Sequence, residues 1–138
     1  MSDALGLLSL SRKAGKIKLG ETPVLSEIDS RKARLVLVAS DAAANTVRRI
    51  RKAVEKTHIV FVVAPYTKEQ LGSAFGRASL AACAVSDIGF SAAFLGALEA
   101  LSPGKYDSQI RAIRETADRI ALRKQKKPGQ GTGKADKT

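Results

Sequence analysis

Cysteine, histidine and aromatic residues are scarce in this chain. Its 138 residues include one cysteine, Cys83, and one histidine, His58, while tryptophan is absent and aromatic residues make up 4%. A single cysteine cannot form an internal disulfide, and one cysteine with one histidine cannot build a zinc cluster. We therefore expect no metal site and no cofactor. Cys83 lies in an apolar run and is interpreted as a small core residue in a protein of the reducing cytoplasm.

Long apolar runs are also missing. No stretch approaches the roughly 18 consecutive apolar residues that a membrane-spanning helix requires. The apolar N-terminal stretch, residues 5–10, is followed by Arg12 and Lys13, whereas a signal peptide carries its positive charge before the apolar segment. The sequence therefore predicts neither a membrane partner nor export.

Motifs for catalysis are incomplete. A phosphate-binding loop requires Gly-Lys followed by Ser or Thr, and here Gly15-Lys16 is followed by Ile17. Residues 72–76 imitate the Gly-x-Ser-x-Gly nucleophile motif but fall within and after a predicted helix instead of at a turn from strand to helix. His58 precedes a predicted strand and has no acid or nucleophile near it in the sequence. We expect no catalytic residue.

Positive charge is in large excess. The chain has 24 Lys and Arg residues against 13 Asp and Glu residues, which gives a net charge of +11 and an isoelectric point near 10.2. The net charge is +6 over residues 1–56, −1 over 57–104, +1 over 105–120 and +5 over 121–138. Two basic regions thus flank a nearly neutral block. This distribution favours a polyanionic partner such as nucleic acid, although a basic surface can also serve solubility alone.

The spacing of apolar residues alternates between helical and strand periods. It predicts helices over residues 3–14, 21–30, 44–56, 68–75, 90–101 and 107–127, and strands over residues 16–19, 34–39, 59–63 and 80–85. Thr22 is the expected N-cap of the second helix, which tolerates Pro23 in its first turn, and Thr67 is expected to open the fourth. The β-branched runs at 34–39 and 59–63 are typical of central strands buried on both faces. The order predicts an α/β sandwich with helices on both faces of a sheet.

The C-terminal region divides into two parts. Residues 105–127 have the pattern of an amphipathic helix with a polybasic end, and its apolar side contains Ile110, Ile113, Ala117 and Ile120. Residues 128–138 are rich in Gly, Lys and Thr without a hydrophobic pattern, so we expect a disordered basic tail. The compact domain is therefore expected to occupy residues 1–104.

Several sequence blocks resemble a known family. They are residues 7–16 (LLSLSRKAGK), Gly20-Glu21, residues 32–41 (KARLVLVASD), residues 68–72 (KEQLG) and Gly76. In this order and spacing they resemble the bacterial branch of the kink-turn RNA-binding ribosomal proteins, the family of archaeal L-seven-Ae and eukaryotic L-thirty-e. The resemblance covers about residues 4–100. It implies a three-layer α/β/α sandwich around a four-stranded mixed sheet and a non-enzymatic RNA-binding role for the domain at residues 1–104.

The resemblance also implies a binding site. Members of the family contact a kinked RNA through the turn after the first strand, the start of the second helix, and the loop between the last strand and the last helix. These parts correspond here to residues 18–23 and 87–89. The arginines of the helix expected at 44–56 are further candidates for RNA contact. The expected RNA-binding residues are Lys16, Lys18, Gly20, Glu21, Thr22, Arg48, Arg49, Asp87, Ile88 and Gly89.

Some of these residues have an alternative interpretation. Lys16 and Lys18 occupy alternating strand positions and are expected to contact phosphates, but they also suit a solvated strand face. Arg48 and Arg49 also suit the solvated face of a charged helix. Ile88 suits either packing against RNA bases or an ordinary place in the core.

Three positions depart from the pattern of the family. By alignment, Thr22, Pro23 and Ser26 stand where relatives have a polar pair that reads bases and, three residues on, a lysine that contacts phosphate. Thr22 can donate and accept a hydrogen bond, but Pro23 has no backbone N–H to donate. RNA binding is therefore expected with reduced specificity for kink-turns.

The sequence leaves three functions open, of which the third is an accessory domain of an enzyme system that modifies RNA. The first is a non-enzymatic protein of ribosomal-protein type that binds ribosomal or other structured RNA in a bacterial cytoplasm. The alternative is a protein-interaction module on the same fold that has lost its RNA site and docks a protein partner through Ile110, Ile113 and Ile120. Only RNA binding predicts an affinity that falls steeply with salt.

Overall fold

The computed structural model describes residues 3–126, which form six helices and four strands. The tail expected at residues 128–138 lies outside the described residues. Every expected element is present in the expected order, with ends that differ from the predictions by at most two residues. The helices are α1 (Asp3–Lys13), α2 (Glu21–Asp29), α3 (Ala44–Val54), α4 (Lys68–Ser73), α5 (Ile88–Leu101) and α6 (Asp107–Lys126), and the strands are β1 (Ile17–Leu19), β2 (Leu35–Val38), β3 (Val60–Val63) and β4 (Ala82–Val85).

The strands form one mixed sheet in the order β1-β4-β2-β3. β4 runs antiparallel to both β1 and β2, while β2 and β3 are parallel. Every residue of β2 and β4 is buried. β3 is an edge strand in which Val63 is 41% exposed, so the prediction of a central strand at residues 59–63 was wrong. Because α6 packs against β3, the apolar run of β3 resembles that of a central strand.

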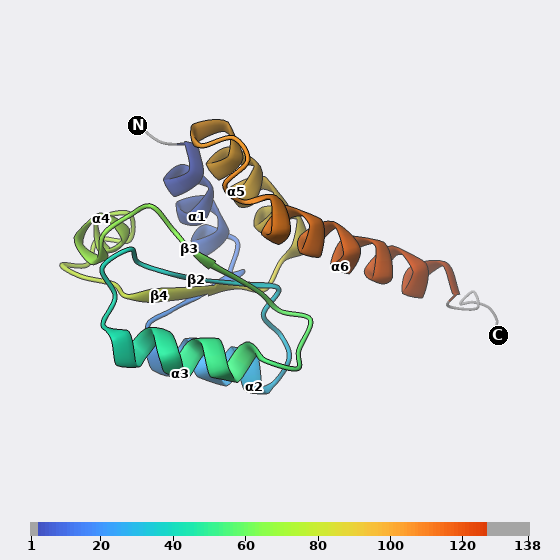
Figure 1. Cartoon of the computed structure of the whole chain (residues 1–138), viewed down its shortest axis with the longest axis horizontal. Coiled ribbons are helices and arrows are strands. Elements are labelled where there is room, and N and C mark those ends of the chain that lie inside the picture. The colour runs from blue at the N-terminus through green and yellow to red at the C-terminus, as the bar shows by residue number, and fades with distance from the viewer. Residues whose placement is uncertain (1–2, 127–138) are drawn as a thin grey trace.

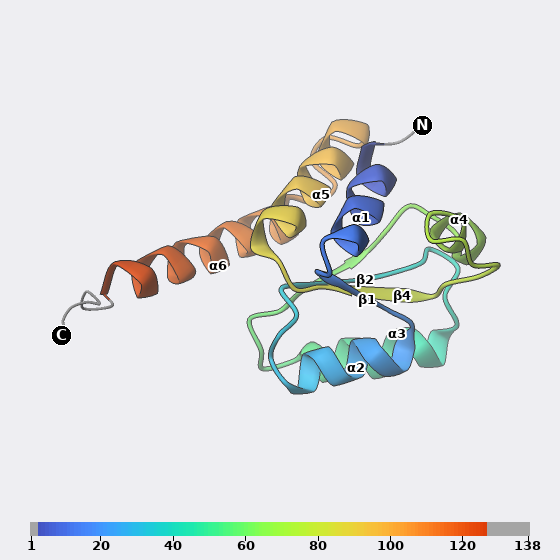
Figure 2. The same ribbon diagram turned by 180° about the vertical axis from the view of Figure 1, so that it is seen from behind.

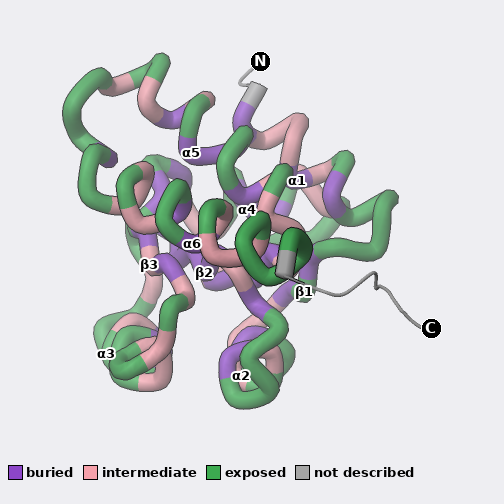
Figure 3. Tube along the Cα trace, turned by 90° about the vertical axis from the view of Figure 1, so that its right-hand side faces the viewer, coloured by how far each residue is buried: buried purple, intermediate pink, exposed green. Residues whose placement is uncertain are grey.

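Helices cover both faces of the sheet (Figures 1 and 2), which confirms the predicted sandwich. On one face, Val24 and Ile28 of α2 and Ile50 of α3 pack against Val36 and Ala84 of the strands. On the other face lie α1 and α5, and α6 packs against α5 and β3. Figure 3 shows buried segments along the strands and exposed segments on the outer sides of the helices. The hydrophobic core therefore has two layers, one on each face of the sheet.

The sheet has two ends with different neighbours. At the end next to α4, which we call the α4 end, Gly20 donates to the carbonyl of Ala82 at 2.9 Å and Ala39 donates to that of Ala81 at 2.8 Å. At the opposite end, which we call the α6 end, the N–H of Ser86 donates to the carbonyl of Lys16 at 2.9 Å. α2 and α3 both begin at the α4 end, whereas α6 extends past the opposite end (Figure 2).

The predicted N-cap of α2 and the predicted start of α5 were wrong, whereas the predicted N-cap of α4 is confirmed. The N-cap of α2 is Gly20, so Thr22 is the second residue of that helix. α5 begins at Ile88 because Asp87 Oδ2 accepts the N–H of Phe90, which places Ile88 and Gly89 in the helix instead of a loop. Thr67 opens α4 as predicted, through a reciprocal capping box with Gln70.

Gly72 lets the loop between α4 and β4 lie close to α4. A Cβ atom at this position would lie 2.7 Å from the carbonyl oxygen of Arg77 and 2.8 Å from the nitrogen of Ser79. Both atoms belong to the backbone, so neither can move away by a simple change of rotamer. The absence of a side chain at Gly72 therefore allows residues 77–79 to follow this path.

We expect Gly72→Ala to lower the free energy of unfolding by about 1 to 3 kcal/mol, the usual cost of overpacking. Gly96→Ala is the matched control, because Gly96 is an exposed helical glycine whose added Cβ would meet nothing within 4 Å. The control should raise the free energy of unfolding by about 0.5 to 1 kcal/mol through helix propensity. Urea unfolding of both variants measures the difference, and equal effects would contradict the close approach.

Candidate nucleic-acid interface

α2 and α3 begin next to each other at the α4 end of the sheet. Their N-caps, Gly20 and Ala43, make no side-chain hydrogen bond to the helices. The first N–H groups of a helix have no carbonyl of the same helix to bind, and they form the positive end of the helix dipole. Two such ends side by side favour an anionic ligand.

Gly20 carries the chain directly from β1 into α2. Its φ angle is +99°, in the left-handed range that residues with a side chain adopt only at a cost. Besides the bond from its N–H to Ala82, its carbonyl accepts the N–H of Val24 at 3.0 Å. These bonds hold the start of α2 against the start of β4.

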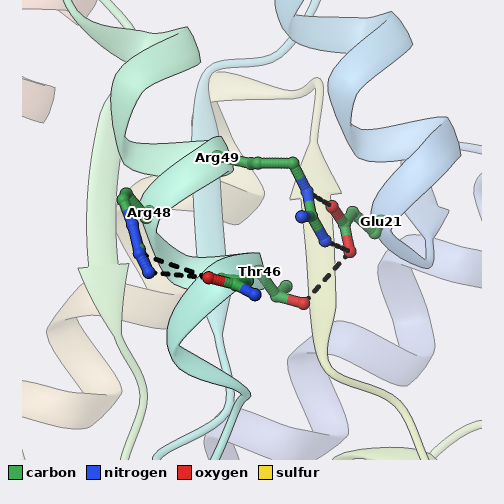
Figure 4. A network of polar contacts seen from close by, with 5 residues as sticks. Glu21, Thr46, Arg48 and Arg49 are labelled. Atoms are coloured by element: carbon green, nitrogen blue, oxygen red, sulfur yellow. Dashed lines mark hydrogen bonds and ion pairs between the residues drawn. The ribbon is translucent and has the colours of Figure 1, made fainter.

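Glu21 joins the two helix starts through an ion pair (Figure 4). The Nε of Arg49 pairs with Oε2 of Glu21, and its Nη2 donates to Oε1 at 3.1 Å. Thr46 Oγ1 donates to the same Oε1 at 3.1 Å. The hydrogen bond from Arg49 lowers the pKa of Glu21 below its ordinary 4.5, against the opposing effect of desolvation. The predicted site residues Glu21 and Arg49 are therefore brought together and bind each other.

Arg48 is held by a neutral partner. Its Nη2 and Nη1 donate to Oδ1 of Asn45 at 2.6 and 3.2 Å. Both Arg48 and Arg49 lie at exposed positions, and the side chain of Arg49 is 56% exposed. An RNA phosphate that binds either guanidinium has to share or replace these internal hydrogen bonds, and Arg48 gives up only a neutral amide when it does so.

The two predicted lysines lie at different places along β1. Lys18 is exposed between the buried Ile17 and Leu19, which face the core with α1 and α5. Since side chains alternate along a strand, Lys18 is on the same face as α2 and α3. Lys16 precedes the strand, and its carbonyl accepts from Ser86 at the α6 end. The structure therefore does not place Lys16 beside Gly20.

The predicted residues after β4 are also separated from Gly20. Asp87 caps α5 at the α6 end, with its Oδ2 accepting the N–H of Phe90 at 2.8 Å. Ile88 is partly buried and packs against the core with α1 and α5, as in its core interpretation. Gly89 is exposed beside it. A role of these three residues in RNA binding stays a prediction, but it requires a contact at the opposite end from the starts of α2 and α3.

The sequence analysis missed the loop between α4 and β4 as a neighbour of the site. Residues 74–81 lead into β4 at the point where Ala82 binds Gly20, and they contain the exposed Arg77. The signal available in the sequence was the pair of glycines Gly72, in the last turn of α4, and Gly76, inside this loop. Its place became clear only from the antiparallel pairing of β1 with β4.

No group of three or more His, Cys, Asp or Glu residues within 3–126 is arranged to hold a metal ion. Burial raises the pKa of the Cys83 thiol to about 12, and its place in the core is confirmed. None of the helices in the described part of the chain is long and apolar enough to cross a membrane.

Comparison with known proteins identifies the family. The profile of the ribosomal protein L7Ae/L30e/S12e/Gadd45 family matches residues 2–95. The chain belongs to this family. It is 33% identical to the RNA-binding protein YlxQ of Bacillus subtilis (strain 168) over 97 residues, which cover 67% of this chain and 92% of that protein. It is 38% identical to the RNA-binding protein YlxQ of Enterococcus faecium over 48 residues, 35% of this chain and 47% of that protein.

Two solved structures are similar in fold to this chain. A protein with unknown function from Bacillus halodurans C matches with a TM-score of 0.67 and 25% identity, over 72% of this chain and 99% of that one. The Giardia lamblia 15.5kD RNA binding protein matches with a TM-score of 0.59 and 25% identity, over 70% of this chain and 85% of that one. Because the family profile ends at residue 95, α6 lies outside the region it matches.

The ion pair at the start of α2 predicts how this family member responds to acid. Because the pKa of Glu21 is lowered in the folded state, the pair stabilises the fold above pH 4.5, and this stabilisation is lost as the pH falls through the folded-state pKa. In Arg49→Gln we expect the pKa of Glu21 to rise toward 4.5. The variant should be less stable than the wild type at neutral pH, and this difference should disappear in acid. NMR titration measures the pKa of Glu21, and urea unfolding at several pH values measures the stability.

Arg48→Gln is the matched control for Arg49→Gln. It removes the same charge from the next position of α3, where the partner is the amide of Asn45. An unchanged Glu21 pKa in Arg49→Gln, or an equal shift in the control, would contradict the pairing.

Proposed function

We propose that this chain is a non-enzymatic protein that binds structured RNA at the α4 end of its sheet. The observation that carries the proposal is that α2 and α3 start side by side at this end, without side-chain caps, among exposed arginines. Membership of the L7Ae/L30e/S12e/Gadd45 family and the similarity to proteins named as RNA-binding support it. The cellular setting that we expect is the bacterial cytoplasm.

RNA phosphates are the groups that such a surface would bind. The first N–H groups of the two helices would donate to phosphate oxygens, and the exposed cations Lys18, Arg48 and Arg77 would add charge around them. Gly20 has no side chain that would keep the RNA backbone away from the turn. These contacts are independent of base identity, so they supply affinity and position more than they supply sequence specificity.

The preference for kinked RNA that we propose is modest. Thr22, Pro23 and Ser26 are all exposed on α2 and available to a ligand, but none has the paired donors and acceptors or the charge of the residues that relatives have there. Single-stranded loops and bulges expose phosphates and splayed bases that a regular duplex hides. The shape of a structured RNA, and not base reading at α2, would therefore determine the preference.

The packing of α6 removes the main support for a protein-docking module. Ile113 is 2% exposed in the chain's own core, and Ile110 packs against the same core. Ile120 is partly buried. The apolar side of α6, which the alternative function assigns to a protein partner, is thus largely used within the chain.

Thr22→Asp tests the proposed surface. A carboxylate at the second residue of α2 suits the helix dipole, so the stability should be unchanged or higher by about 0.3 to 1 kcal/mol. The same charge repels phosphates, and we expect RNA affinity to fall by at least about tenfold. Fluorescence anisotropy at several salt concentrations, with a kink-turn RNA and an unkinked duplex of equal length, measures both the affinity and the preference.

Ser108→Asp is the matched control. Ser108 is the second residue of α6, is exposed, and receives the same charge on a helix of the opposite layer. Its RNA affinity should stay close to that of the wild type. Equal losses of RNA affinity in both variants would mean that only the net charge matters, and not the position of the charge. A wild type without salt-dependent RNA binding would refute the proposed function.

A further inference from the structure

A cleft of about 250 Å³ lies at the α6 end of the sheet, between α6 and the loops that precede β2 and β3. Its lining has an unusual charge composition: six side chains are basic or histidine, and Asp and Glu are absent from it. The six are Arg31, Arg34, Lys56, His58, Arg119 and Arg123. Segments distant in the sequence thus gather positive charge on both walls of one cleft.

Within residues 3–126, the cations of this cleft form no ion pair with a carboxylate. The ion pair found within residues 3–126 is the one between Arg49 and Glu21, away from this cleft. Arg31 Nη1 donates to the carbonyl of Ile28 at 3.0 Å, and Arg119 Nη2 donates to Thr116 Oγ1 at 2.9 Å. Each bond uses a single nitrogen of a guanidinium that has five N–H donors. Most of the donor capacity in the cleft is therefore left for a ligand.

The backbone on one side of the cleft supports this arrangement. Among the described residues, Arg31 and Lys56 are the two that have a side chain and a positive φ, at +60° and +64°. Both line this cleft, at the ends of α2 and α3. Left-handed backbone costs energy for such residues, so the two turns bring long cationic side chains to the cleft at some expense of stability.

The opposite wall lies outside the region that the family profile matches. The family profile ends at residue 95, and α6 supplies Thr116, Arg119, Ile120 and Arg123. Figures 1 and 2 show α6 running past the end of the sheet, at the opposite end from α4. The chain then continues with a net charge of +5 over residues 121–138. The cleft is thus separate from the surface at the starts of α2 and α3.

We infer that this cleft binds phosphate groups of an RNA backbone, as a second contact for an RNA held at the α4 end. Phosphate suits the cleft because guanidinium groups on both walls can bind its oxygens in pairs. The lining has no Phe, Tyr or Trp on which a base could stack, and no carboxylate that could accept from a base amino group. The inference depends on the proposed function, because it assigns the cleft a second segment of the same RNA.

The test compares two double variants on the same helix. Arg119→Gln with Arg123→Gln removes two charges from the cleft, and Arg111→Gln with Arg114→Gln removes two charges from the part of α6 that lies beside Glu99 and Asp107. In the first we expect structured RNA to bind at least about tenfold more weakly, with a salt slope lower by about 1.4 to 1.8 for two lost phosphate contacts. The second should change affinity and slope much less.

Further measurements distinguish a failure of the cleft inference from a failure of the proposed function. If both double variants lose affinity equally while Thr22→Asp still weakens binding, the cleft inference is wrong and the proposed function stands. If the wild type binds no structured RNA, the proposed function itself fails. A titration with inorganic pyrophosphate tests a free phosphorylated ligand: binding that requires Arg119 and Arg123, with RNA affinity unchanged in their variant, would overturn the RNA assignment.

Discussion

The antiparallel direction of β4 between β1 and β2 decides which parts of this chain lie together. Because β4 enters at the α4 end, the loop before it meets Gly20 and the start of α2, and the residues after it leave at the α6 end. The parallel pair β2 and β3 sends the chain out at the α4 end as well, where α3 begins. The hydrogen bonds of one buried strand therefore assemble two helix starts at one end and the α6 cleft at the other.

The two ends compensate their positive charge in different ways. At the α4 end the helix dipoles and Arg49 are balanced in part by Glu21, whose lowered pKa shows that its charged form is stabilised there. This internal carboxylate links α2 to α3, and in the proposed complex it would compete with an RNA phosphate for Arg49. At the α6 end the cleft has no such counter-charge in its lining. Under the proposal above, a phosphate in the cleft would therefore compete with no carboxylate of the lining, which suits a contact that strengthens binding begun elsewhere.

Much of the fold could be predicted from the sequence because apolar spacing reports local structure well. The predicted helices and strands, the α/β sandwich and the core position of Cys83 all depended on patterns within about twenty residues. The edge position of β3 did not follow, since α6 covers a face of it from far along the chain. The N-caps at Gly20 and Asp87 were missed because a cap depends on the geometry of one turn, for which several nearby residues compete.

The site was harder to predict than the fold, because its residues come together only through strand pairing. Glu21 and Arg49 were both selected from the sequence, yet their ion pair depends on α2 and α3 starting at the same end. Lys16 and Asp87 were selected too, and the register of β1 with β4 places them at the α6 end. The cleft between α6 and residues 31–34 and 56–59 gave no local signal at all, since charged helix faces and basic loops are common.

The most direct test of the account is an NMR titration of the isotope-labelled full chain with a structured RNA, followed through its backbone amide signals. The account predicts that the largest shifts fall on Glu21, Thr22 and the first residues of α3, with a second group at residues lining the α6 cleft. Amide signals at the starts of α2 and α3 that stay unchanged at saturating RNA would contradict it.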